Sequence, residues 1–208
     1  KNRILYLLLV VTLIAGIVTF GMRKQQQQQE ARLHSMKAQE LEAMLVKQPN
    51  APSVLYALGL AYAREGQYPK AVKQFLTLLE KEPTRADVWN DLGVAYLLQG
   101  RYYESLVSFQ RALELKPNYA ATYANLGRLH IATKMPFTAA KELEKSNQLE
   151  PNNLATLCDL GQAYQRTLNY KSSLETYQKA LGVDTQSVQA LIGAGQAHYA
   201  MTHYDQAE

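Results

Sequence analysis

The hydrophobic pattern of the chain after residue 51 repeats every 34 residues, and each repeat predicts two helices joined by a short turn. A glycine stands at the same place in the first helix of each repeat: Gly59, Gly93, Gly127, Gly161 and Gly195. Chance does not explain this spacing, because glycine occupies only 11 of the 208 positions. A fixed period of this length is typical of solenoids, in which each repeat packs against its neighbours.

Prolines and turn glycines mark the helix boundaries. Four prolines keep the same 34-residue interval: Pro49, Pro83, Pro117 and Pro151. Each is expected to end a second helix, because proline lacks an N–H and disfavours helix in the residue before it. Gly66 and Gly100 fit the turns within the first two hairpins. The third hairpin lacks this glycine, and we expect Pro136 to open its second helix.

The second repeat carries the fullest motif. Its residues follow the spacing W-x2-LG-x2-Y, then F-x2-A and a proline, at Trp89, Leu92, Gly93, Tyr96, Phe109, Ala112 and Pro117. This pattern resembles the tetratricopeptide repeat, with a departure at Ser105, where the family has alanine. The resemblance implies an all-α solenoid, a right-handed superhelix of hairpins over residues 52–208. The repeats are 52–85, 86–119, 120–153, 154–187 and a partial one at 188–208.

An apolar segment precedes the repeats. Residues 4–22 (ILYLLLVVTLIAGIVTFGM) contain no charge, and as a helix they would span roughly 28 Å. A cleaved signal peptide is the rival interpretation, but no small-x-small cleavage site follows the segment. We therefore predict one transmembrane helix in an anchor of residues 1–24. A short flank before a long folded domain places the repeats on the non-cytoplasmic, periplasmic side.

Residues 25–51 connect the predicted anchor to the repeats. Gln25–Gln29 is a glutamine run that favours a helical spacer. Glu30–Lys47 has one apolar face and ends before Pro49, in register with the later prolines. We expect it to be one helix that takes the place of a second helix and caps the stack. At the other end Glu208 falls inside a second helix, and we expect the polypeptide to continue.

Composition and motifs favour no catalytic or nucleic-acid-binding class. The chain has 22 Lys and Arg against 18 Asp and Glu, scattered without a basic run, which argues against nucleic acid as a partner. Cys158 is the only cysteine, so no disulfide framework or multi-cysteine metal site exists within the chain. His130 and His198 replace the repeat's tyrosine and are interpreted as packing residues. No phosphate loop or H-E-x-x-H motif occurs, and we expect no enzyme activity, cofactor or metal.

The resemblance also implies a protein-binding groove lined by the first helices. The family's inner-wall positions correspond here to Tyr56, Leu60, Ala63, Arg64, Asn90, Val94, Leu97, Leu98, Ala124, Arg128, Ile131, Cys158, Gln162, Gln165 and Arg166. Asp91, Asn125 and Asp159 recur before each Leu-Gly pair, and partly resemble a ladder that holds peptide amides in some members. Such a wall suits a helix or extended peptide with apolar anchors and some acid. The alternative is a solvated groove with the partner elsewhere.

Together these features predict a membrane-anchored protein-interaction scaffold, a subunit or assembly factor of a membrane multiprotein complex. Two alternatives stay open. In the first alternative, the chain is the docking or regulatory region of a larger enzyme whose catalytic domain lies beyond residue 208. In the second, it is a receptor or translocation component for polypeptides.

Overall fold

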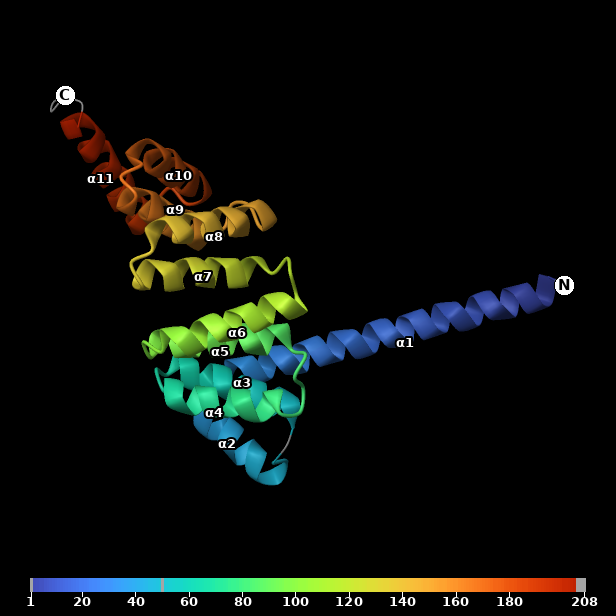
Figure 1. Cartoon of the computed structure of the whole chain (residues 1–208). Coiled ribbons are helices and arrows are strands. Elements are labelled where there is room, and N and C mark those ends of the chain that lie inside the picture. The colour runs from blue at the N-terminus through green and yellow to red at the C-terminus, as the bar shows by residue number, and fades with distance from the viewer. Residues whose placement is uncertain (1, 50, 205–208) are drawn as a thin grey trace. The chain divides into compact units, whose positions relative to one another are not determined.

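The computed structural model describes residues 2–49 and 51–204, with the backbone alone for residues 2–15, 203 and 204. All regular structure in this part of the chain is helical, which confirms the all-α prediction (Figure 1). In chain order the helices are α1 (Asn2–Ser35), α2 (Ala38–Lys47), α3 (Pro52–Arg64), α4 (Tyr68–Leu79), α5 (Ala86–Leu98), α6 (Tyr102–Leu115), α7 (Ala120–Ala132), α8 (Pro136–Leu149), α9 (Leu154–Arg166), α10 (Tyr170–Val183) and α11 (Val188–Tyr204). They form two compact units, residues 1–78 and 79–208.

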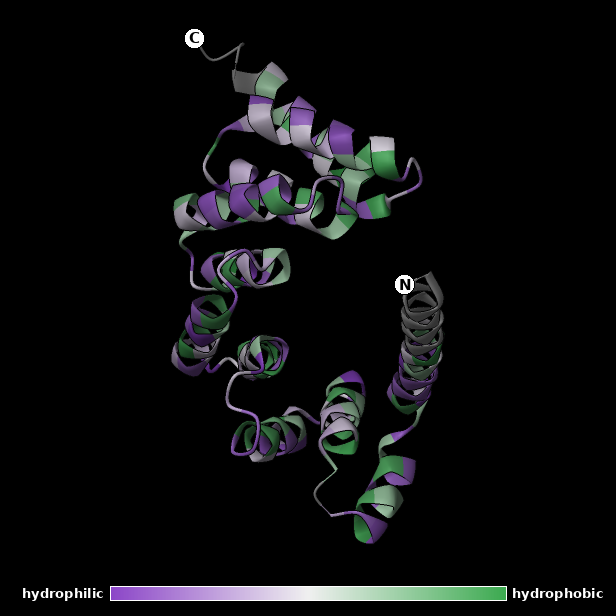
Figure 2. Ribbon diagram, turned by 90° about the vertical axis from the view of Figure 1, so that its right-hand side faces the viewer, coloured by the Kyte–Doolittle hydropathy of each residue, from purple (hydrophilic) through white to green (hydrophobic). Residues whose placement is uncertain are grey.

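The repeat glycines let the two helices of each hairpin approach closely. In the first four repeats the glycine of the first helix faces one large, buried side chain of the second helix: Phe75, Phe109, Leu143 and Tyr177. The hairpin helices carry both hydrophobic and hydrophilic residues along their length, as expected of helices that bury one face (Figure 2). The predicted 34-residue hairpins are therefore present.

Serine replaces the family's alanine at the small position of two second helices, and the structure gives the reason. The Ser105 hydroxyl donates a hydrogen bond to the Gly93 carbonyl at 2.8 Å. Ser173 donates to the Gly161 carbonyl at 2.9 Å in the equivalent place. Both serines are completely buried, so the hydrogen bond satisfies a hydroxyl that would otherwise destabilise the core.

Left-handed residues close the turn within each hairpin. Four residues occupy this position with positive φ: Gly66 (74°), Gly100 (72°), Lys134 (60°) and Leu168 (61°). The next residue donates its N–H to the carbonyl five positions earlier, as Met135 does to His130 at 2.8 Å. Helix α8 begins at Pro136 as predicted. The third hairpin nevertheless keeps the turn geometry of the others, with lysine where two of them have glycine.

The segment before the first repeat differs from the prediction. The helix expected over Glu30–Lys47 is interrupted at Met36 and Lys37, because α1 ends at Ser35 and α2 begins at Ala38. Both α1 and α2 contact α3. Arg64 stabilises the break by donating to the carbonyls of His34 and Met36, the latter at 3.1 Å. The C-terminal end of α1 and the helix α2 thus both pack on the first helix of repeat one.

A tyrosine–glutamate hydrogen bond joins α3 to α2, and an equivalent hydrogen bond joins α9 to α8 in the second unit. The Tyr62 hydroxyl donates to the Glu42 carboxylate, and Tyr164 donates to Glu144 at 2.6 Å. These two pairs occupy equivalent positions in the 34-residue period. Burial and the Glu42 carboxylate raise the pKa of Tyr62 to about 12, so this tyrosine stays a neutral donor.

The predicted membrane anchor is not confirmed. No helix in the described part of the chain combines the length and the hydrophobicity that crossing a bilayer requires. Residues 4–15, most of the predicted span, have side chains outside those that the structure describes. The backbone of α1 continues from the apolar segment through the glutamine run to Ser35 without a break.

Candidate protein-binding surface

The first helices of the second unit form a continuous row. Helix α5 contacts α7, α7 contacts α9, and α9 contacts α11. Each first helix also packs along its own second helix, as α7 does on α8 (Figure 1). The row α5, α7 and α9 is called the inner wall below, and it carries most of the residues predicted for binding.

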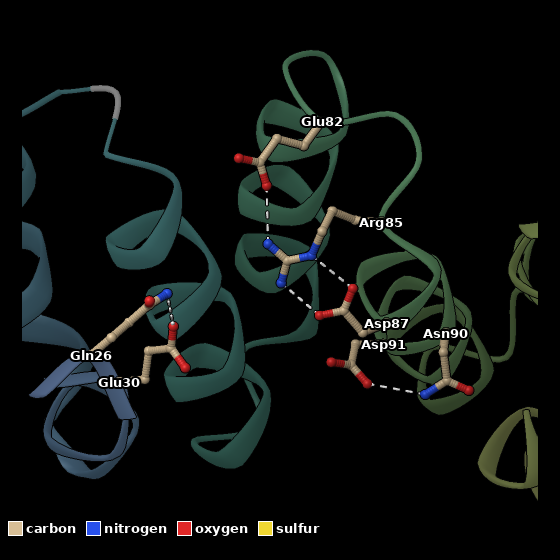
Figure 3. A network of polar contacts seen from close by, with 7 residues as sticks. All are labelled: Gln26, Glu30, Glu82, Arg85, Asp87, Asn90 and Asp91. Carbon is tan, nitrogen blue, oxygen red and sulfur yellow. Dashed lines mark hydrogen bonds and ion pairs between the residues drawn. The ribbon is translucent and has the colours of Figure 1, made fainter. Parts of the chain in front are cut away.

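Hydrogen-bonded side chains cross the inner wall from helix to helix. The Asn90 Oδ1 of α5 accepts from Thr122 Oγ1 at 2.9 Å and from Asn125 Nδ2 at 3.0 Å, both on α7. Asn90 also donates through Nδ2 to Asp91 Oδ1 at 3.1 Å (Figure 3). The carbonyl oxygen of one asparagine amide therefore ties α5 to α7, and its nitrogen binds a neighbour on α5.

Arg128 extends this chain of contacts to α9. Its Nη1 donates to Asn125 Oδ1 at 3.1 Å, and its Nε donates to Asp159 Oδ2 at 2.6 Å. The Arg128 side chain is 42% exposed and that of Asp159 is 17% exposed. The guanidinium of this ion pair is therefore partly exposed to solvent.

These contacts make one network, called the polar ladder below: Asp91, Asn90, Thr122, Asn125, Arg128 and Asp159. The sequence predicted Asp91, Asn125 and Asp159 as parallel rungs for a peptide. The structure joins them through Asn90 and Arg128 instead. Asn90 is 5% exposed and Asn125 is 8% exposed, so their amides are used within the wall.

Thr122 is the member of the ladder that the sequence analysis missed. It is completely buried, and the equivalent residues of the two preceding repeats are Val54 and Val88, which are also buried. Threonine in place of a buried valine is therefore the signal that could have identified it. A hydroxyl at such a position needs a partner, and here the partner is Asn90.

The predicted apolar residues of the inner wall are exposed to different degrees. Val94 and Leu97 are partly buried against the cluster of Phe109, Leu126 and Leu129. Ile131 is partly buried against the next cluster, around Leu143 and Leu160. Leu98 is 54% exposed at the end of α5.

The remaining predicted residues of the second unit lie on α9. Gln162 is half-buried and Arg166 is exposed, and Arg166 Nη1 approaches the Ile131 carbonyl at 3.4 Å. Gln165 donates to the Gly193 carbonyl at 3.0 Å. Cys158 is 1% exposed and Ala124 is buried, so neither lies on the surface of the wall.

The predicted residues of the first repeat lie in the first unit, where Tyr56 and Arg64 contact the end of α1. The Tyr56 ring meets the His34 ring edge-on at 5.7 Å between centroids. Arg64 is exposed and bonds to the last carbonyls before α2, while Leu60 and Ala63 are half-buried.

A second group of charges lies where α5 begins. Arg85 donates from Nε to Asp87 Oδ1 at 2.8 Å and from Nη1 to Glu82 Oε2 at 3.0 Å, so its guanidinium joins two carboxylates (Figure 3). Burial by itself would raise the pKa of Asp87, but the hydrogen bond and charge of Arg85 lower it on balance. In the first unit, Gln26 donates to Glu30 at 3.0 Å along α1 (Figure 3).

The described histidines and the cysteine differ in burial. His130 is half-buried, and burial lowers its pKa against the opposing charge of Glu142. His198 is exposed on α11, and the second helix of its repeat lies outside the described residues, so its interpretation as a packing residue stays a prediction. Burial raises the pKa of the Cys158 thiol. Among the described residues, no three His, Cys, Asp or Glu side chains gather as metal ligands would.

Comparisons with known proteins agree with this architecture. Two family profiles described as tetratricopeptide repeat match the chain, one at residues 38–78 and 56–120 and the other at 154–187. No curated protein sequence matches the chain significantly.

Solved structures share the fold at low sequence identity. The crystal structure of MamA is 22% identical, with a TM-score of 0.63 over 73% of this chain and 89% of that chain. TTC0263, a thermophilic tetratricopeptide protein of Thermus thermophilus, is 20% identical, with a TM-score of 0.67 over 78% and 89%. A chain of the APC/C hetero-tetramer Cut9–Hcn1 is 18% identical, with a TM-score of 0.71 over 85% of this chain and 36% of that chain.

Stacked helical hairpins whose first helices form a row define a helical-repeat protein, a class that generally presents surfaces to other proteins. The two matching profiles together cover more than half of the chain. The chain belongs to the tetratricopeptide-repeat family.

Proposed function

We propose that this protein is a protein-interaction scaffold that holds a helix or an extended peptide on the inner wall of its second unit. The observation that carries the proposal is the polar ladder. It fixes α5, α7 and α9 against one another by side-chain hydrogen bonds, so the wall is rigid before a partner arrives. A preorganised surface loses less conformational entropy on binding than one that must be ordered.

The exposed parts of the wall define the chemistry of the partner. Leu98 is 54% exposed and is available to an apolar anchor of a partner. Arg128 and Arg166 are the accessible cations, and they favour an acidic residue near that anchor. An amphipathic helix or an extended peptide with apolar and acidic residues meets both requirements.

Binding to the wall is tested by exchanging its exposed leucine for a charge. Leu98→Asp should weaken partner retention by about tenfold or more, because a charge at the wall opposes burial of an apolar anchor. The matched control is Val183→Asp, which changes a residue of similar exposure, 45%, at the far end of α10. The measurement is quantitative mass spectrometry of proteins that co-purify with each full-length variant. Equal partner sets for both variants would reject the inner wall as the binding surface.

The composition of the retained set separates the kinds of scaffold. A permanent subunit keeps one partner set in fixed ratio, and an assembly factor releases it. A receptor for polypeptides crosslinks to many unrelated clients through a photoreactive residue at Leu97 or Ile131. A catalytic domain fused after residue 208 would identify the chain as the docking region of an enzyme.

We further propose that the scaffold serves a membrane complex, tethered through residues 4–22 with the repeats on the non-cytoplasmic side. The support is the uncharged apolar sequence, whose length suits a bilayer. The test is alkaline extraction of membranes carrying the full chain, followed by protease protection. Release of the chain into the supernatant would refute the tether without affecting the inner wall.

A further inference from the structure

The two edges of the second unit differ in the hydrophobic residues that they expose. One edge holds the turns within hairpins, residues 99–104, 133–138 and 167–172, and is called the turn edge. Its exposed large apolar residues are Tyr102 (42%), Tyr103 (77%), Met135 (49%), Phe137 (76%) and Leu168 (60%). The opposite edge, called the loop edge, holds residues 116–121, 150–155 and 184–189. Its one such residue among those described is Val188 (67%).

The turn edge is also the more basic of the two edges. The turn edge has Arg101, Lys134 and Lys171 against the single acid Glu104. Arg101 Nη2 binds Glu104 Oε1 at 2.7 Å, which leaves the edge a net surplus of two lysines. Both lysines are exposed. The loop edge has Lys116 against Glu150 and Asp184, so it is slightly acidic.

Two turns of the turn edge contain backbone strain that a glycine would relieve. Lys134 and Leu168 adopt left-handed φ angles of 60° and 61°, where Gly66 and Gly100 stand in the other hairpins. A side chain in this region costs roughly 1–2 kcal/mol relative to right-handed backbone. Both side chains point into solvent rather than into a core that would repay the strain. Strained residues of this kind gather at functional surfaces.

We infer that the turn edge is a docking surface for an anionic lipid bilayer. Its aromatic and aliphatic side chains protrude from separate turns, next to lysines with no ion pair among the described residues. Aromatic residues settle at the headgroup level and basic residues are attracted to anionic headgroups. Tyr103 and Phe137 stand three-quarters exposed, so both rings can enter a headgroup layer without a partner pocket shaped to receive them. A fluid surface needs no such match in shape.

The test places a fluorescent probe on each edge of the full chain. Phe137→Cys puts it on the turn edge and Val188→Cys on the loop edge, and the native Cys158 is too buried to be labelled. Vesicles of phosphatidylcholine with brominated acyl chains, with or without phosphatidylserine, serve as the quencher. We expect quenching at position 137 in the anionic vesicles, little in the neutral ones, and little at position 188 in either. A tether through residues 4–22 brings both probes to the vesicle together, so it does not mimic this difference.

Charge reversal gives the second arm. In the Phe137→Cys chain, Lys134→Glu with Lys171→Glu should reduce quenching to the level of the position 188 probe. Lys145→Glu with Lys179→Glu changes two exposed lysines of α8 and α10 instead, and should leave quenching unchanged. Equal quenching of both probes, equal quenching in neutral vesicles, or none at all would overturn the inference. Protection of the position 137 probe by a protein partner without lipid quenching would assign the edge to protein instead.

Discussion

The ring of Phe109 lies so close to the backbone of Gly93 that a Cβ on residue 93 would be 2.5 Å from the ring's Cε1. No carbon can stand at that distance, so an alanine forces the ring or the helix to move. We expect Gly93→Ala to destabilise the protein by about 1–3 kcal/mol through overpacking, despite alanine's better helix propensity. Urea unfolding followed by circular dichroism measures this change.

The matched control is Gly182→Ala, which changes a helical glycine in the last turn of α10. A Cβ there meets nothing within 4 Å. Alanine should then be neutral or stabilise the protein by up to about 1 kcal/mol through helix propensity alone. Equal destabilisation by both substitutions would show that overpacking is not the reason for the glycine.

At the left-handed turns, a change to glycine is expected to stabilise the protein. Lys134→Gly should stabilise the protein by about 0.5–1 kcal/mol, because glycine removes the steric strain at φ 60° but loses more backbone entropy on folding. Gly100→Ala, at φ 72° in the preceding hairpin, should destabilise it by about 1 kcal/mol. The midpoints of urea unfolding for both variants measure the pair. A destabilised Lys134→Gly protein would contradict the strain argument.

The ladder asparagine should be among the most sensitive polar residues. Asn90→Ala removes the acceptor of Thr122 and Asn125, leaving two buried donors unsatisfied, and should cost about 1–3 kcal/mol. Thr122→Val removes one donor and keeps the volume, and valine already stands at the equivalent Val88. This variant should cost less than Asn90→Ala. Equal unfolding free energies for the wild type and Asn90→Ala would show that the ladder does not hold the wall.

His130 makes stability depend on pH. Burial lowers its pKa, so the folded protein binds this proton less readily than the unfolded chain. The stability that His130 contributes is therefore fully present above the pKa of about 6.5 that it has in the unfolded chain. This stability is lost as the pH falls through the pKa of the folded protein. His130→Tyr, the family residue, should reduce the fall in melting temperature between about pH 7.5 and pH 5.5. His198→Tyr changes an exposed residue and should leave that fall as it is; an unchanged fall in His130→Tyr would contradict the prediction.

Periodic local features could be predicted from the sequence. The hairpin boundaries could be predicted because glycine and proline restrict the backbone at their own positions. One such boundary is the start of α8 at Pro136. The break at Met36 could not be predicted in this way. It depends on Arg64, which binds the carbonyls of His34 and Met36 from a distant point in the chain. Hydrophobic spacing alone favoured one continuous helix there.

The candidate site was only partly predictable for a similar reason. The spacing placed Asn90, Asn125 and Asp159 on neighbouring helices, and the structure brings them into one network. Thr122 was missed because its role depends on a partner 32 residues away. Whether an asparagine faces a ligand or its neighbour is decided by burial, and Asn90 and Asn125 are buried.

The sequence by itself determined the helical hairpins, their 34-residue period and the side chains that fill them, because backbone propensity and close packing within a hairpin are local. Only the tertiary structure decided which polar side chains are used up inside the wall and which apolar ones stay exposed at the turns. Those outcomes depend on contacts between successive repeats, where the geometry of the stack, rather than any one residue, fixes the partners.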